Sequence, residues 1–293
     1  MSLLDIFRSR KRSAGPPPSA EESTRPLFVL DAEMRTDVGC VRESNEDSGS
    51  IRHDHNAGSG DRALIVVADG MGGHNAGEVA SATAVKVVEA AYPLMNQHPA
   101  ENLKRALEEA NDAIHRQAAE RPSMSGMGTT CTALLVQGEH AYSAHVGDSR
   151  LYLIRNGSIY LMTEDHSAVM ELVKAGQITL EEGRHHPDKN VVTRSLGGRE
   201  QVEVSTWPQP LRVMPNDRFL LCSDGLYDQV EDNEMYETVR SQSTGDACQR
   251  LVNLARERGG PDNITIAIVA VRPVDETFDS KAPATRQVEI SRR

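Results

Sequence analysis

Short apolar runs rich in β-forming residues recur along the chain, and they limit the fold more than any other feature of the sequence. Two of these runs are joined by Asn156-Gly157. This dipeptide is the signature of a two-residue type I′ turn, so it predicts an antiparallel hairpin. The runs lie at residues 27–39, 62–69, 129–137, 141–148, 150–155, 158–163, 201–207, 217–224 and 263–271.

Helical periodicity occupies other segments, in which apolar residues recur so as to form one face. Strands come in clusters and helices in adjacent pairs, which disfavours the βαβ alternation of a parallel sheet. We therefore expect an α+β fold with layered antiparallel sheets. The helical segments are residues 76–95, 101–120, 167–176 and 245–259, and the predicted apolar faces are Val85, Val88, Tyr92 and Met95 in the first and Leu103, Leu107, Ala110 and Ile114 in the second.

Several β-rich runs end in an aspartate. In the stretch VVADGMGGHNAGEVAS, Asp69 follows an apolar run and precedes a glycine-rich loop, and Asp148 and Asp224 also follow apolar runs. Asp262 stands at the beginning of such a run instead. Asp-Gly and Asp-Asn are ordinary turn dipeptides, which would suffice to explain any one of these residues. The joint pattern favours a shared role, because the strand that a hairpin requires does not follow Asp69.

The glycine-rich loop does not have the spacing of a phosphate-binding loop. A P-loop needs Gly-Lys-Ser/Thr, which is absent, and Asn75 stands where a GxGxxG motif needs its third glycine. The chain also has no GxSxG nucleophile motif. Histidine pairs at residues 53 and 55 and at 185 and 186 have no partners at ligand spacing in the sequence, which favours solvated loop residues over a zinc site.

Aspartates that gather at strand ends repel one another unless cations hold them. Carboxylate and carbonyl oxygens without a nearby Cys or His set indicate a hard divalent ion, Mg²⁺ or Mn²⁺, rather than zinc. Glycine lacks a Cβ, so a backbone oxygen such as that of Gly70 can approach a metal closely. The sequence therefore predicts an oxygen-ligated metal centre.

Six short blocks follow one another along the chain: RESNEDS (42–48), DGMGGHNAGE (69–78), GTTCTALLV (128–136), HVGDSRLYLIRNG (145–157), SDGLYD (223–228) and PDNITIAIV (261–269). With these blocks in this order, the chain resembles, over residues 30–272, the metal-dependent protein phosphatases of the PP2C (PPM) type in their bacterial form. The resemblance implies a PP2C-like central antiparallel β-sandwich flanked by helices on both faces, in α-β-β-α layers, with a two-metal centre at one end.

The resemblance also implies which residues hold the Mn²⁺ or Mg²⁺ ions. Asp69 matches the aspartate that bridges the two ions, and the carbonyl of Gly70 completes the first. Asp224 and Asp262 match ligands of the second ion.

Other acidic positions match more peripheral roles in the family. Asp47, with Glu46 beside it, matches residues that hold metal-bound water. Asp148 and Asp228 match ligands of a third, more weakly bound ion that is present in some members.

Two further residues are candidates for contact with the substrate. Arg42 matches the phosphate-binding arginine of the family, whose guanidinium would grip phosphate oxygens as a bidentate fork. His74 is a candidate general acid, with metal-bound water as the alternative. Met71 stands where eukaryotic members carry a histidine.

The implied reaction is hydrolysis of phosphoserine and phosphothreonine in proteins by direct attack of a water that bridges two ions. The partners would be phosphorylated proteins, with a cognate Ser/Thr kinase acting on the same substrates. A noncatalytic phosphoprotein-binding scaffold and a phosphatase of small metabolites are the alternatives. Residues 164–190 match a variable flap beside the active site, and Arg194 matches a supporting position near it.

The ends of the chain differ in composition from its middle. Residues 1–26, which include PPPSAEES, predict a disordered extension and linker, residues 27–273 a catalytic domain, and residues 274–293 a flexible tail.

Charge and apolar patterning limit the partners and the compartment. The net charge of −11 argues against nucleic acid as a partner, and no apolar run approaches the length of a membrane span. The four cysteines have wide spacings and predict reduced, buried thiols. We therefore expect a monomeric cytoplasmic protein without a transmembrane segment.

Overall fold

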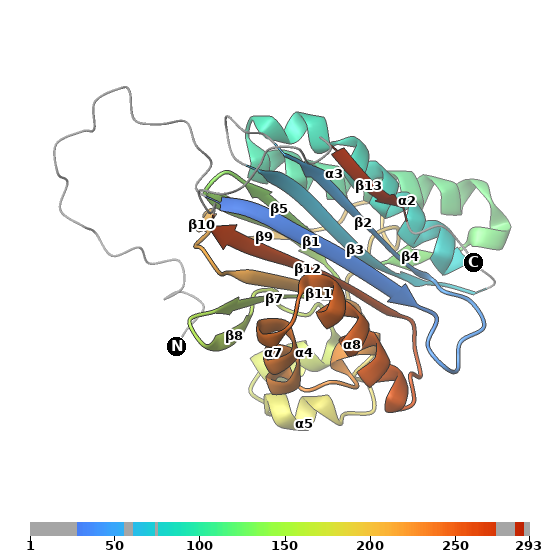
Figure 1. Cartoon of the computed structure of the whole chain (residues 1–293). Helices are drawn as coiled ribbons and strands as arrows, with labels where there is room; N and C mark the ends of the chain where they lie inside the picture. The colour runs from blue at the N-terminus through green and yellow to red at the C-terminus, as the bar shows by residue number, and fades with distance from the viewer. Residues whose placement is uncertain (1–27, 56–60, 74–75, 274–284, 290–293) are drawn as a thin grey trace.

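The computed structural model describes residues 28–55, 61–73, 76–273 and 285–289, with the backbone alone for the last range. Within these residues, two antiparallel sheets form the middle of the molecule (Figure 1). The first sheet has the strand order β1-β12-β11-β7-β8. Its strands are β1 (Phe28–Asp37), β12 (Ile264–Pro273), β11 (Arg218–Cys222), β7 (Arg150–Arg155) and β8 (Ser158–Leu161).

The second sheet has the strand order β10-β6-β5-β3-β2-β13, with β4 paired to β3 and β9 paired to β6. Every pairing in it is antiparallel. Its strands are β2 (Asp47–Asp54), β3 (Arg62–Met71), β4 (Gly128–Thr129), β5 (Cys131–Gln137), β6 (His140–Val146), β9 (Ser205–Thr206), β10 (Leu211–Arg212) and β13 (Thr285–Glu289).

Helices cover the outer face of each sheet (Figure 1). The helices α2 (Ala76–Ala90) and α3 (Pro99–Glu120) pack on the second sheet, with the short 3₁₀ helices η1 (Tyr92–Asn96) and η2 (Pro122–Met124) beside them. The first sheet is covered by α6 (Asp224–Tyr227), α7 (Asp232–Ser241) and α8 (Thr244–Glu257). Two more helices, α4 (Ala168–Lys174) and α5 (Leu180–Arg184), lie in the connection between β8 and β9.

The apolar run of β3 is continuous because both of its faces are buried. Leu64, Val66 and Ala68 pack against the helices, whereas Ile65 and Val67 pack between the two sheets. A strand buried on both faces needs apolar residues at every position rather than at alternate ones. The result is the predicted sandwich of α-β-β-α layers.

The hairpin prediction is confirmed, and a helix forms in each of the four predicted segments, but the first one ends at Ala90 and continues as the 3₁₀ helix η1 rather than running to residue 95. Asn156 and Gly157 both have positive φ, at 51° and 80°, and join the antiparallel strands β7 and β8. The eight residues of the two predicted helical faces are all buried. Among the residues that the structure describes, every helix is too short or too polar to cross a bilayer.

Other local predictions differ from the structure. Only Ser205–Thr206 of the predicted strand at 201–207 is extended in a sheet, and β2 was not predicted at all. Ile51 is the single large aliphatic residue of β2, so this strand depends on pairing with β3 rather than on an apolar pattern. Three of the cysteines are buried, but Cys40 is exposed in the loop after β1, which corrects the prediction of buried thiols throughout.

Strand β13 lies inside the segment predicted to be a flexible tail. The structure pairs it instead with β2, from Thr285 opposite Asp54 to Glu289 opposite Ser50. The free edge of β2 offers unpaired backbone groups, which an added strand can satisfy. The predicted extension at 1–26 and the other residues of the predicted tail lie outside the described residues.

Candidate metal centre

Two aspartates meet at one end of the β2–β3 pair, where Asp47 lies directly opposite Asp69. Asp47 is buried, whereas Asp69 is partly exposed. The backbone of Asp69 is fixed on both sides. Its N–H donates to Thr130 Oγ1 (2.9 Å), and Thr129 Oγ1 donates to its carbonyl oxygen (2.8 Å). These bonds fix the position from which the Asp69 carboxylate projects.

Three more aspartates come from neighbouring strand ends. Asp148 follows β6, Asp224 follows β11, and Asp262 precedes β12. Each of the three acts electrostatically on Asp69, as does Asp47. The fold therefore brings together the four aspartates whose positions at strand ends the sequence indicated, and adds Asp47 to them.

Burial and like charge both favour the protonated form of these carboxyls. Burial, followed by the charges of Asp47, Asp224, Asp148 and Asp262, raises the pKa of Asp69 well above its usual range. Burial raises the pKa of Asp47 to about 6 and that of Asp148 to about 7. Burial and the charge of Asp148 raise the pKa of Asp224 well above its usual range. Such a cluster calls for bound positive charge.

Two oxygen atoms of the cluster show that the residues fit a metal. Asp47 Oδ1 and Asp224 Oδ1 are buried and have no hydrogen-bond partner among the described residues. A buried carboxylate oxygen without a donor is costly unless a cation contacts it. Donors that are all oxygen suit Mg²⁺ or Mn²⁺. Asp47, Asp69, Asp224 and Asp262 would hold such ions.

Among the described residues, the group with three ligand atoms all within 4.8 Å of one another is His53, His55 and Asp61, and no three of the aspartates are gathered as closely. A more open set of carboxylates is compatible with a pair of ions about 4 Å apart that share one ligand.

One arginine lies at the rim of the cluster. Arg42 Nη2 donates to Asp262 Oδ2 (2.8 Å), and the Arg42 side chain is 50% exposed. Burial opposes the charge of Arg42, but the hydrogen bond to Asp262 and the charges of Asp262, Glu46 and Asp69 raise its pKa above the ordinary value. Arg42 is therefore a permanent cation that faces both the carboxylates and the solvent.

Comparison with known proteins decides the family. The family model of protein phosphatase 2C matches residues 34–264. The chain belongs to the protein phosphatase 2C family. Curated relatives include the serine/threonine phosphatase Stp of Listeria monocytogenes, 38% identical over 246 residues that cover 82% of this chain and 95% of the relative. The serine/threonine protein phosphatase PstP of Mycobacterium tuberculosis is 40% identical over 263 residues, which cover 88% of this chain and 48% of the relative.

Solved PP2C structures agree with the fold. The M. tuberculosis phosphatase PstP/Ppp superposes with a TM-score of 0.76 at 38% identity, over 83% of this chain and 99% of that one. The catalytic domain of PstP in complex with two manganese ions superposes with a TM-score of 0.70 at 37% identity, over 84% of this chain and 99% of that one. The aspartate cluster thus belongs to a PP2C fold that binds two Mn²⁺ in a solved relative.

The glycine-rich loop of this PP2C chain is packed backbone against backbone. A Cβ added to Gly70 would lie 2.2 Å from the carbonyl oxygen of Gly77 and 2.5 Å from that of Glu46. Gly70 also donates its N–H to the Glu46 carbonyl (3.2 Å). The glycine is therefore needed for the close approach that places Asp69 beside the loop before β2.

The sequence analysis missed two polar residues that organise the centre. Asn263 accepts the Glu46 N–H (2.8 Å) and donates to the carbonyls of Val38 and Ser44 (3.0 Å each), so it holds the loop that carries Arg42. Ser223 Oγ donates to Asp47 Oδ2 (2.7 Å). Each is the sequence neighbour of a metal-site aspartate in the PDN and SDG blocks, and this adjacency was the available signal.

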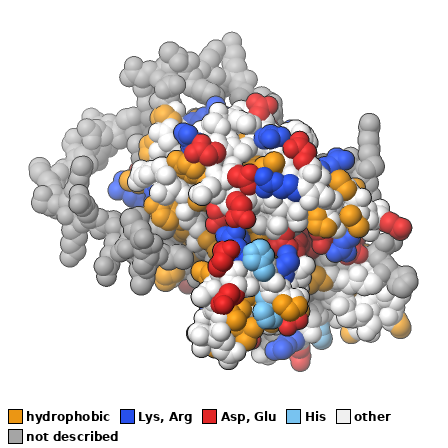
Figure 2. Space-filling model, turned by 90° about the horizontal axis from the view of Figure 1, so that it is seen from below, with side chains coloured by type: hydrophobic (Ala, Val, Ile, Leu, Met, Phe, Trp, Pro, Cys, Tyr) orange, Lys and Arg blue, Asp and Glu red, His pale blue; other side chains and the backbone are white. Residues whose placement is uncertain are grey.

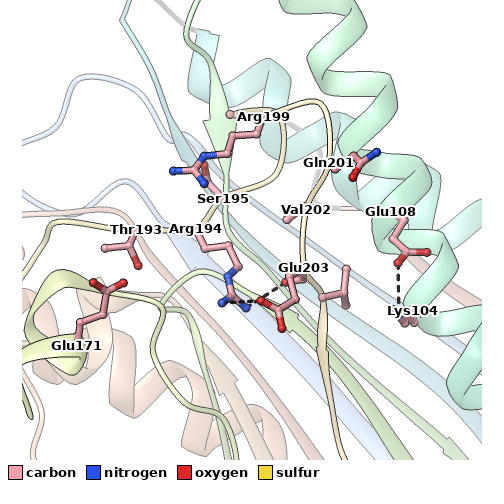
Figure 3. A pocket seen from close by; sticks show the side chains of 12 residues that line it. Lys104, Glu108, Glu171, Thr193, Arg194, Ser195, Arg199, Gln201, Val202 and Glu203 are labelled. Carbon is pink, nitrogen blue, oxygen red and sulfur yellow. Dashed lines mark hydrogen bonds and ion pairs between the residues drawn. The ribbon is translucent and has the colours of Figure 1, made fainter. Parts of the chain in front are cut away.

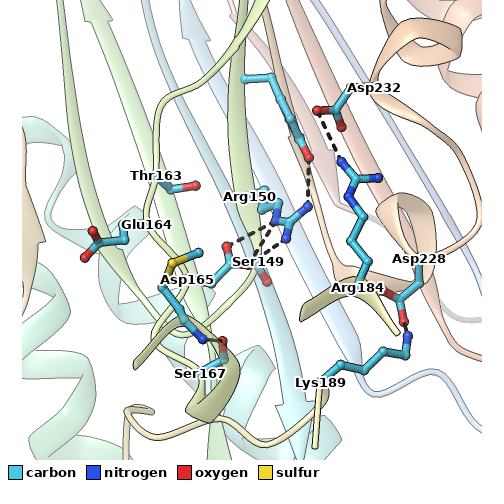
Figure 4. Close-up of polar contacts among 12 residues, drawn as sticks. Ser149, Arg150, Thr163, Glu164, Asp165, Ser167, Arg184, Lys189, Asp228 and Asp232 are labelled. Carbon is cyan, nitrogen blue, oxygen red and sulfur yellow. Dashed lines mark hydrogen bonds and ion pairs between the residues drawn. The ribbon is translucent and has the colours of Figure 1, made fainter. Parts of the chain in front are cut away.

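The carboxylate of Asp228 forms an ion pair with a lysine of the flap, residues 164–190. Lys189 Nζ forms an ion pair with Asp228 Oδ2, and Figure 4 shows the two side chains meeting beside Arg184, which reaches Asp232 (3.8 Å). Arg184 also donates to Glu231 (2.8 Å). The flap of this PP2C chain is thus tied to α7 and to the aspartate at the end of α6.

A second ion pair, shown in Figure 4, anchors the start of the flap. Arg150 at the start of β7 donates from Nε and Nη2 to the carboxylate of Asp165, at 3.1 Å and 2.7 Å. The pair is largely buried and bidentate, which fixes its geometry. The flap therefore begins from a rigid point near Asp148.

A cavity of ≈ 1010 Å³ opens beside the flap and away from the aspartates. Arg194, Arg199 and Glu171 are among its lining residues, and Figure 3 shows Arg194 paired with Glu203 (3.0 Å). The face on the side of α5 carries Asp and Glu side chains interspersed with Lys, Arg and His (Figure 2).

His74, the candidate general acid, lies outside the described residues.

Proposed function

We propose that this chain is a Mn²⁺- or Mg²⁺-dependent protein phosphatase that hydrolyses phosphoserine and phosphothreonine in proteins. The observation that carries the proposal is the convergence of buried and partly exposed aspartates, two of which have buried oxygens without a hydrogen-bond donor. The family and the names of the relatives support the same substrate class.

The residues have distinct tasks in this proposal. Asp69 would contact both ions, Gly70 would add its carbonyl to the first, and Asp224 and Asp262 would hold the second. When bound, the two ions would supply a shared water of lowered pKa and would neutralise phosphate charge. Asp148 and Asp228 would hold a third ion.

Arg42 would bind the non-bridging oxygens of the phosphate. Its side chain is half-exposed beside Asp262 at the rim, where a phosphorylated side chain would enter. A planar fork with two N–H donors fits a phosphate better than a lysine ammonium does. His74 stays the candidate donor of a proton to the leaving alkoxide.

The physiological setting follows from the substrate class. Phosphorylated proteins would be the substrates, a Ser/Thr kinase would oppose the enzyme, and the enzyme would act as a cytoplasmic monomer. The net charge of −11 makes a local cation such as Arg42 necessary for any phosphorylated partner.

Hydrolysis of p-nitrophenyl phosphate with Mn²⁺, and with a chelator in its place, tests this function. We expect turnover with Mn²⁺ and none with the chelator, whereas a noncatalytic scaffold would be inactive in both. Comparison of kcat/KM for phosphopeptides and for sugar phosphates then separates a protein phosphatase from a metabolite phosphatase. Turnover that persists in the chelator would overturn the proposal.

A further inference from the structure

A second group of ligand-type side chains lies at the far end of the β2–β3 hairpin. His53 is in β2, His55 follows the strand, and Asp61 immediately precedes β3. His53 is six residues along β2 from Asp47, which at strand rise corresponds to about 20 Å. The group is therefore separate from the aspartate cluster.

One carboxylate oxygen is the centre of this group. Asp61 Oδ2 lies 3.2 Å from His53 Nε2 and 3.2 Å from His55 Nδ1. The three ligand atoms all lie within 4.8 Å of one another. The prediction that the histidines at 53 and 55 lack a partner at ligand spacing is therefore wrong, because the hairpin brings Asp61 to them. His185, of the other pair, is 82% exposed and fits the prediction of a solvated residue.

These distances match the edges of a tetrahedral coordination sphere. Zinc binds imidazole nitrogen and carboxylate oxygen at about 2.0–2.2 Å, which separates neighbouring ligand atoms by about 3.3 Å. Both measured N···O distances are close to that value. The third distance joins His53 Nε2 to His55 Nδ1. A small movement of His55, whose side chain is the most exposed of the three at 39%, would bring this distance to the same value.

The carboxylate is held in place independently of the histidines. The N–H of Leu30 in β1 donates to Asp61 Oδ2 (2.8 Å), and the Asp61 side chain is only 4% exposed. Because β1 belongs to the first sheet and the hairpin to the second, this bond joins the two sheets. An ion at this position would clamp the end of the sandwich that lies away from the aspartates.

We propose that His53, His55 and Asp61 bind one Zn²⁺ ion, which stabilises the fold and takes no part in phosphate hydrolysis. Two imidazoles and one carboxylate suit zinc, whereas ligands that are all oxygen suit Mg²⁺ or Mn²⁺. The chain thus separates two classes of metal by donor type. Water would be the fourth ligand.

Zinc binding to the full chain tests the proposal. The metal-stripped protein is dialysed against Zn²⁺ with an excess of Mg²⁺ to occupy the aspartate centre, and bound zinc is measured by mass spectrometry. We expect His53→Gln/His55→Gln to bind one equivalent of zinc less than the wild type, and zinc to raise the Tm of the wild type but not of this variant. His185→Gln/His186→Gln is the matched control and keeps the full equivalent.

Phosphatase activity with Mn²⁺ reports whether the variant is folded, and it should be unchanged because the site is remote from the aspartates. If the double variant does not fold, the single variant His55→Gln replaces it, with zinc affinity reduced at least ~10-fold. Equal zinc content and equal Tm shifts in the wild type and in the variants at 53 and 55 would overturn the proposal.

Discussion

Asp47 and Asp69 face each other across the β2–β3 pair in antiparallel register, and the charge of Asp47 adds to burial in raising the pKa of Asp69. An adjacent pair of strands normally avoids like charges at opposed positions, because they destabilise the sheet. The sheet tolerates them here because the end at which they lie is built to hold cations. Stability and metal binding are therefore opposed at this site.

The substitution Asp69→Asn separates these two effects. The amide would remove the ligand proposed to contact both ions, so we expect kcat with Mn²⁺ to fall by roughly 10³-fold or more. In the presence of a chelator, loss of a carboxyl that is repelled by its aspartate neighbours should raise the free energy of unfolding by about 1–2 kcal/mol, which corresponds to an increase in Tm of roughly 2–6 °C. Steady-state kinetics and thermal unfolding measure the two quantities.

Asp112→Asn is the matched control, because it replaces an exposed aspartate of α3 that is outside the centre. It should leave both the kinetics and the Tm unchanged. A variant at Asp69 that kept full activity, or that was less stable than the wild type without metal, would contradict this account of the centre.

Arg42→Lys tests the role of the guanidinium. A lysine keeps the charge but loses the two-pronged donor geometry, so we expect kcat/KM for a phosphopeptide to fall about 10- to 100-fold, with the Mn²⁺ dependence retained. Stability should change little, because the ion pair with Asp262 is half-exposed. Arg35→Lys, at an exposed position in β1, is the control. Equal kinetics for both lysine variants would exclude phosphate binding by Arg42.

Asn263→Ala removes the residue that holds the loop from Val38 to Glu46. Its three hydrogen bonds are lost, and the polar groups of that loop lose their partner, so the unfolding free energy should fall by about 2–4 kcal/mol. The KM should also rise, since the loop carries Arg42. Urea unfolding and kinetics are the measurements, and Asn253→Ala on the exposed face of α8 is the control. A loss no larger than that of the control would show that Asn263 does not hold the loop.

Some residues of the metal centre could be predicted from the sequence alone, and others could not. Asp69, Asp148 and Asp224 could be selected because each follows an apolar run, a local pattern that the chain displays directly. The strand that carries Asp47 could not, because β2 is formed by pairing with β3 rather than by its own residues. The layered α+β class followed from the grouping of strands and helices, but the sandwich itself came from the family resemblance.

Contacts between residues that are distant in the sequence could not be predicted from local sequence patterns. Asn263 bonds to Val38 and Ser44 more than two hundred residues away, and neither end of these bonds has a distinctive spacing. Asp61 meets His53 only because the hairpin register brings both to the same end. Such relationships depend on the pairing of strands, which the order of residue types does not show.

Lys189→Ala tests whether the flap lysine competes with a metal ion for Asp228. The ion pair between them neutralises a carboxylate that would otherwise be available to a cation. A partly exposed pair contributes up to about 1 kcal/mol, so its removal should tighten binding of an additional Mn²⁺ by about 2- to 5-fold. Isothermal titration with Mn²⁺ measures this affinity.

Lys174→Ala, which removes the flap ion pair with Glu164, is the control and should leave the Mn²⁺ affinity unchanged. Unchanged affinity in both variants would rule out the competition.

Two buried histidines, one in β6 and one at the start of the flap, predict the pH dependence of stability. Burial lowers the pKa of His145 to about 4 and that of His166 to about 3. His166 Nδ1 accepts the N–H of Gly147 (3.0 Å), which requires the neutral ring with its proton on Nε2. An unfolded histidine has a pKa of about 6.5. Between these values the unfolded chain binds protons that the folded chain does not, so the free energy of unfolding decreases as the pH falls below about 6.5.

His145→Gln isolates this effect. At pH 7 the variant should be less stable than the wild type, because glutamine cannot reproduce the ring's packing and its contacts with Thr132 Oγ1 (2.9 Å) and the Glu164 carbonyl (3.2 Å). Glutamine does not titrate, so the difference in unfolding free energy should narrow by about 3 kcal/mol between pH 7 and pH 4. Urea unfolding in a chelator measures the unfolding free energy of each protein at each pH. The titration of the aspartates cancels in the difference because both proteins share it.

His140→Gln, at an exposed position of β6, is the control, and its difference from the wild type should not vary with pH. A constant difference for His145→Gln as well would mean that folding does not shift the pKa of the buried ring, which would contradict this account.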